Sequence, residues 1–91
     1  MITEFHYEGE EKNGIWLCNT FYSKDFPIDL KIGDEIWMYD FKDMLTEGEF
    51  YTIDENETYN KEFDFGLSKV TGMSYGKEGG EIIKILSLEL I

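Results

Sequence analysis

Side chains that could do covalent or metal chemistry are few in this 91-residue sequence. There is one histidine, His6, one cysteine, Cys18, and no Gly-x-Ser-x-Gly motif. A nucleophile needs a base beside it, and a zinc site needs several nitrogen or sulfur ligands. The spacing of the carboxylates selects no pair for glycoside hydrolysis. We therefore predict a non-enzymatic protein with no catalytic residue, no metal and no cofactor.

Two segments look like ligand-binding loops but lack residues that such loops need. The run that starts at Asp54 is acidic like a calcium loop, yet it has no glycine at the sixth position and has Phe65 at the twelfth. The glycine-rich segment 76–80 has no Lys-Ser/Thr ending and carries Glu78, which disfavours phosphate binding. We interpret the first as an acidic turn and the second as a hairpin tip.

Negative charge is concentrated between residues 34 and 64. This stretch holds eleven carboxylates against Lys42 and Lys61, in a chain whose formal net charge is −12, and aromatic residues are interspersed among them. Such a surface can imitate a nucleic-acid strand and occupy a basic groove on another protein. The predicted partner-binding residues are Asp40, Asp43, Glu47, Glu49, Tyr51, Asp54, Glu55, Glu57, Tyr59, Glu62 and Asp64. The alternative is a solvated acidic face that keeps the domain soluble and monomeric.

Overall charge and composition indicate which kind of partner the protein binds and which kind of genome encodes it. A charge of −12 disfavours direct binding to nucleic acid or to an anionic membrane, so the expected partner is a basic protein surface, such as that of a nucleic-acid-handling protein. The chain has no Arg, Ala or Gln, which is typical of AT-rich genomes. With no apolar span or signal peptide, these features predict a cytoplasmic inhibitor from a bacterium, its phage or a mobile element.

Apolar residues recur mainly with period two and are often β-branched or aromatic, which predicts strands. We expect strands at 2–7, 15–22, 35–39, 49–54, 63–75 with a break near Gly66 or Gly72, and 81–91. The pattern predicts a mostly β fold, a small barrel or sandwich of about six antiparallel strands in a single acidic domain, 1–91. One short helix is expected near 41–47, capped by Asp40 and ended by Gly48.

Aromatic residues fall on both faces of two predicted strands. Trp16 and Tyr22 share a face of the second strand, and Trp37 and Tyr39 share a face of the third. A small barrel has one interior, so one set must be covered by the short helix, by loop 26–28 or by another chain. Two alternative functions follow, a structural module that forms a homo-oligomer through this face and a β domain that binds a small ligand or sugar.

Overall fold

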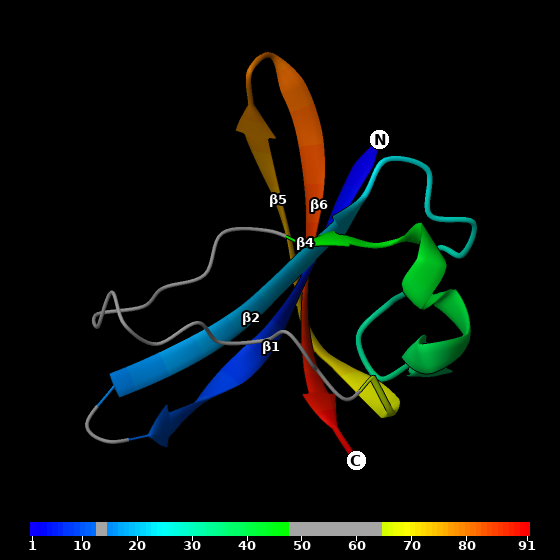
Figure 1. Ribbon diagram of the computed structural model, residues 1–91. Helices are drawn as coiled ribbons and strands as arrows, with labels where there is room; N and C mark the ends of the chain where they lie inside the picture. The colour runs from blue at the N-terminus through cyan, green and yellow to red at the C-terminus, as the bar shows by residue number, and fades with distance from the viewer. Residues whose placement is uncertain (13–14, 48–64) are drawn as a thin grey trace.

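The computed structural model describes residues 1–12, 15–47 and 65–91 (Figure 1). Six strands of this described part form one sheet, and a 3-10 helix, η1, spans Met38–Met44. The strands are β1 (Ile2–Lys12), β2 (Ile15–Ser23), β3 (Glu35–Trp37), β4 (Thr46–Glu47), β5 (Leu67–Glu78) and β6 (Glu81–Leu90). Their order in the sheet is β3-β5-β6-β1-β2-β4. The predicted mostly β class is confirmed, whereas the predicted strand at 49–54 lies outside the described residues.

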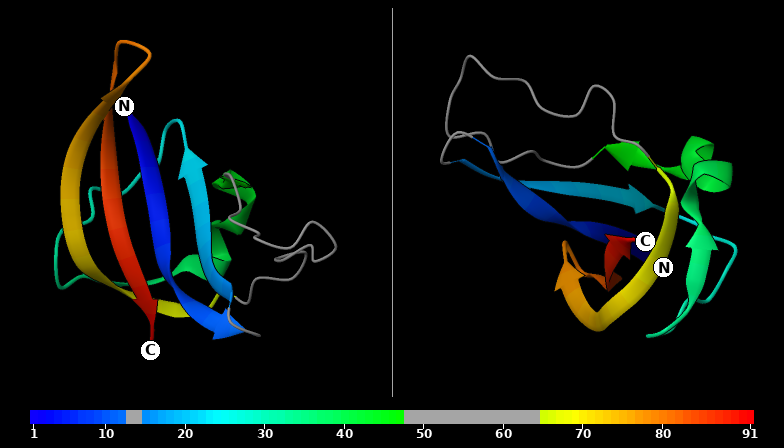
Figure 2. Two further views of the ribbon diagram at one scale, coloured as in Figure 1. Left: turned by 90° about the vertical axis from the view of Figure 1, so that its left-hand side faces the viewer. Right: turned by 90° about the horizontal axis from the view of Figure 1, so that it is seen from below.

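The sheet curls into a half-barrel, and Figure 2 shows β5 bending strongly along its length. A register shift between Val70 and Gly72 against β6 gives β5 one extra residue. An extra residue of this kind bends a strand and changes which side chains face inward. β5 is continuous from Leu67 to Glu78, so Gly66 immediately precedes the strand and Gly72 lies beside a register shift and not at a break.

One strand pair departs from the antiparallel arrangement that we expected. β1 and β6 run parallel, with Phe5 opposite Leu86, while the other pairs are antiparallel. β1–β2 and β5–β6 are each antiparallel pairs of strands that are consecutive in the sequence. Gly79 and Gly80, with φ of 58° and 85°, form the two-residue turn of the second hairpin. How the two hairpins meet is a tertiary choice that strand periodicity does not encode.

The core fills the inner face of this curl. Its buried members are Phe5, Tyr7, Phe21, Leu30, Ile36, Met38, Val70, Leu86 and Leu88, and Phe26, Phe41, Leu45 and Phe65 pack against them. Six of these residues come from the segment 26–45, which crosses the inner face between β2 and β4. A single sheet cannot bury a face by itself, so this segment supplies the second layer.

The short helix differs from the one that we predicted at 41–47. It begins at Met38, is of the 3-10 type, and has no side-chain cap, so Asp40 lies in its first turn instead of capping it. Thr46–Glu47 forms β4 instead of a helical end. The physical reason is packing: a 3-10 turn places residues three apart on one side, so Met38 and Phe41 both reach the core. β3 accordingly ends at Trp37, two residues earlier than predicted.

A buried hydrogen-bond chain crosses the core. The Tyr7 hydroxyl lies 2.8 Å from Ser68 Oγ. The Ser68 hydroxyl donates a hydrogen bond to the Gly66 carbonyl at 3.1 Å. The hydrogen bond between Tyr7 and Ser68 links β1 to the start of β5 although the two strands are not neighbours in the sheet. Burial of the phenol raises the pKa of Tyr7 from 10.0 to about 12, and the Ser68 hydrogen bond offsets part of this increase.

We predict that Tyr7→Phe lowers the free energy of unfolding by about 1–2 kcal/mol near neutral pH, because it removes a buried hydrogen bond. Above pH 10 the unfolded tyrosine ionises before the folded one, so wild type loses about 1.4 kcal/mol per pH unit from this group until about pH 12. Y7F lacks that loss. Urea unfolding between pH 7 and 11 measures both effects, with the exposed Tyr75→Phe as the control.

Candidate functional site

Two of the eleven predicted partner-binding residues have described side chains. Asp40 and Asp43 are both exposed on η1. Glu47 lies in β4, but its side chain is outside the described set. The other eight lie outside the described residues: Glu49, Tyr51, Asp54, Glu55, Glu57, Tyr59, Glu62 and Asp64. The part of the predicted site that can be placed is therefore its N-terminal end.

The aromatic residues at this end face solvent. Trp37 and Tyr39 are 59% and 55% exposed, while their neighbours Ile36 and Met38 are buried in the core. Of the three covers that the sequence left open for one aromatic set, loop 26–28 and the short helix place Phe26 and Phe41 against the core and leave Trp37 and Tyr39 exposed. Phe26 packs on Phe5 instead, with ring centroids 4.9 Å apart, and so covers the inner face of the sheet.

The second predicted aromatic face, that of Trp16 and Tyr22, is on β2 and not on the segment that carries Trp37 and Tyr39. Tyr22 lies opposite Glu4 on the outer face of the β1–β2 ladder, behind the core residues Phe5 and Phe21. It is half-buried there. Trp16 lies in β2, and its side chain is outside the described set.

The geometry of η1 sorts its exposed side chains into rows. In a 3-10 helix residues three apart are eclipsed, so Asp40 and Asp43 share one row and Tyr39 and Lys42 share the next. Lys42 Nζ lies 4.1 Å from the centroid of the Tyr39 ring. Neither Asp40 nor Asp43 forms an ion pair with a described residue. We call the exposed residues Glu35, Trp37, Tyr39, Asp40 and Asp43 the β3–η1 surface.

Main-chain hydrogen bonds hold the β3–η1 surface against β5. Gly33 N donates to the Val70 carbonyl at 2.8 Å, and Val70 N donates to the Asp34 carbonyl at 2.9 Å. The Asp34 carboxylate accepts from Lys31 N at 2.8 Å, so this member of the acidic stretch has a structural role in a turn. Strand alternation then turns Ile36 inward and Glu35 and Trp37 outward.

A buried lysine anchors the connection that leads to β3. The sequence pattern places Leu86 and Leu88 on one face of β6, and the structure adds Lys84 to that inner face with 6% exposure. Its ammonium donates to the Leu30 carbonyl at 2.7 Å and to Asp29 Oδ1 at 2.5 Å. Sequence analysis overlooked Lys84, although a lysine in register with apolar inward positions signals a buried charge that needs partners.

The anchor has an effect on acid stability. Hydrogen bonding and charge attraction from Lys84 hold the pKa of Asp29 below its ordinary value of 3.8. A carboxyl with a lowered folded pKa stabilises the fold above its unfolded pKa, and this contribution disappears as the pH falls through the folded value. The Asp29 side chain is 78% exposed, so solvent weakens the interaction.

We predict that Asp29→Asn destabilises the protein near pH 7 and that its stability difference from wild type shrinks as the pH falls below 3.8. Thermal unfolding followed by circular dichroism from pH 7 to pH 2 measures this. Asp25→Asn is the matched control, because Asp25 is exposed on the same connection and pairs with no described residue. A D29N difference that stayed constant with pH would contradict the assigned role of the charge.

Comparison with protein-family models, curated proteins and solved structures finds no match for this chain. Within residues 1–12, 15–47 and 65–91, no three His, Cys, Asp or Glu side chains lie close enough to hold a metal ion. No helix of this described part is long and apolar enough to cross a membrane. The exposed aromatic and acidic side chains of the β3–η1 surface are the features of the described residues that indicate a function.

Proposed function

We propose that the chain is a non-enzymatic interaction protein that occupies a basic, nucleic-acid-binding site on a partner protein. One observation carries the proposal: Trp37 and Tyr39 are more than half exposed beside Asp40 and Asp43, which have no described ion-pair partner. A tryptophan held in water by a folded scaffold has a large apolar area to bury against a partner. We place this activity in the cytoplasm of a bacterium or a phage-infected cell.

Charge complementarity makes a basic protein the favoured partner of the β3–η1 surface. The chain carries −12 overall, so a cationic groove attracts it at long range and an anionic surface repels it. In the proposed complex, Asp40 and Asp43 steer the encounter and take the places of phosphates. Trp37 and Tyr39 are buried at the centre and act as anchors. Predicted residues between 48 and 64 extend the same acidic sequence, and their part in binding is a further element of this proposal.

The test is displacement of a fluorescent DNA duplex from a panel of purified basic DNA-binding and RNA-binding domains. We predict that the wild-type chain displaces the duplex from at least one domain and that W37S weakens this by about tenfold or more, as expected for an anchor residue. D40N/D43N should weaken it about two- to tenfold at low salt and less at high salt.

The matched control is E78Q/E89Q, which removes the same charge from exposed positions outside the β3–η1 surface. If W37S and D40N/D43N displaced DNA as well as the control variant, the surface would not be the binding site. Failure of the wild-type chain on every basic domain of the panel would count against the nucleic-acid-site proposal itself.

A second candidate function, homo-oligomer assembly, is favoured by the same exposure of Trp37 and by its position at the end of the edge strand β3. Edge strands and exposed aromatic residues are common sites of self-association. In this case acidity would serve solubility alone.

Light scattering coupled to size-exclusion chromatography separates the two functions. Our first proposal predicts a monomer at micromolar concentration whose mass is the same for wild type and W37S. A dimer that W37S converts to monomer would instead assign the aromatic residues to assembly. Tyr75→Ser, an exposed aromatic change on β5, is the control for a general loss of apolar surface.

A further inference from the structure

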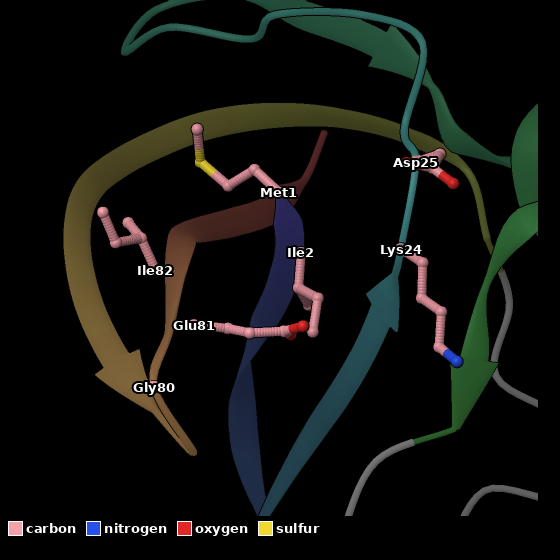
Figure 3. Close-up of a pocket in the computed structure, with 7 residues that line it drawn as sticks. All are labelled: Met1, Ile2, Lys24, Asp25, Gly80, Glu81 and Ile82. Atoms are coloured by element: carbon pink, nitrogen blue, oxygen red, sulfur yellow. The ribbon is translucent and has the colours of Figure 1, made fainter.

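A hollow opens on the inner face of the half-barrel at the end near the β5–β6 turn. Figure 3 shows Met1 and Ile82 within the curve of β5, and Lys24 and Asp25 on the chain that follows β2. This part has a volume of about 660 Å³. An adjoining part of about 330 Å³ shares Met1 and Asp25 and extends under the connection to Thr3 and Lys84.

The floor of the hollow holds two buried polar side chains, those of Thr3 and Lys84, and Ser23 lies beside them in the sheet. Thr3 is opposite Ser23 on β2 and opposite Lys84 on β6, and the three are 9%, 5% and 6% exposed. They continue the inner face beyond Phe5, Phe21 and Leu86, where apolar residues fill the curl. Polar residues at inward-facing positions this deeply buried normally have hydrogen-bond partners.

Part of the hydrogen-bonding capacity of this floor is unused. An ammonium group has three N–H donors, and the described residues supply acceptors for two of those on Lys84, namely Asp29 and the Leu30 carbonyl. The Thr3 hydroxyl, which lines the hollow, makes no hydrogen bond to a described residue. A buried hydroxyl without a partner is unfavourable, and a ligand acceptor would relieve that cost.

We propose that this hollow binds a small apolar molecule that ends in a carboxylate. The carboxylate accepts hydrogen bonds from the third N–H of Lys84 and from the Thr3 hydroxyl. Its apolar part lies against the walls, which the structure builds from Met1, Phe26, Pro27, Ile28 and Ile82. This site is separate from the β3–η1 surface and does not depend on the function proposed there.

The buried ammonium of Lys84 favours a carboxylate over a neutral end group, because the other charges that line the hollow, those of Lys24, Asp25, Asp29 and Glu81, are on exposed side chains. Asp29 is 78% exposed, so water solvates most of its charge, whereas the Lys84 ammonium is at the buried floor. A charge-assisted hydrogen bond to that ammonium is roughly twice as strong as a neutral one. Asp25 and Glu81 line the rim with Lys24, and their negative charge keeps the ligand to a single anionic group.

The test is titration of the full chain with sodium octanoate and, separately, with octan-1-ol, followed by two-dimensional amide NMR. We expect saturable shifts from octanoate below about 10 mM, centred on residues 2–3, 24–29 and 81–84, and binding of octan-1-ol at least about tenfold weaker. No saturation, shifts centred elsewhere, or octan-1-ol binding as tightly as octanoate would overturn the proposal.

Two variants test the floor itself. Thr3→Val should weaken octanoate binding about three- to tenfold while leaving thermal stability unchanged or higher, because it removes a hydroxyl that has no described partner. Thr71→Val, the same change at an exposed position outside the hollow, should leave binding unchanged. Lys84→Met should abolish the preference for octanoate over octan-1-ol. Unaltered octanoate affinity in folded T3V would refute the assigned contact.

Discussion

A curled sheet with one buried face must have that face covered, and among the described residues most of the cover comes from one stretch of chain. Residues 26–45 bring Phe26, Leu30, Ile36, Met38 and Phe41 onto the inner face. Apolar burial drives this packing but does not fix its position. The directional restraint comes from Lys84, whose ammonium binds both the side chain of Asp29 and the carbonyl of Leu30. The rest of the structure depends on this anchored connection.

Exposure of the two aromatic residues is a consequence of the same packing. The Leu30 carbonyl accepts a hydrogen bond from Lys84, and the Asp34 carbonyl accepts one from Val70 N. These bonds place β3 beside β5 with Ile36 facing the core. Alternation then directs Trp37 outward, and the tight turn of η1 returns Met38 to the core, which leaves Tyr39 at the surface. Trp37 and Tyr39 are thus exposed because their neighbours Ile36 and Met38 are buried.

The anchored connection also shapes the hollow. Asp25 to Asp29 form its wall on one side, and the floor residue Lys84 is the anchor itself. One segment therefore carries both candidate surfaces, with the hollow at its beginning and the β3–η1 surface toward its end. Binding at either surface uses geometry that the Lys84 contacts maintain.

The sequence by itself determined the features that depend on neighbouring residues. Period-two patterns located β1, β2, β5 and β6 and the paired glycines located their turn, because alternation and positive φ are local properties. It could not determine that β1 and β6 pair in parallel, that Lys84 binds Asp29 and the Leu30 carbonyl, or that Trp37 stays exposed. Each of these depends on which segment covers which face, and contacts between residues such as Leu30 and Lys84, 54 positions apart, decide that only when the chain has folded.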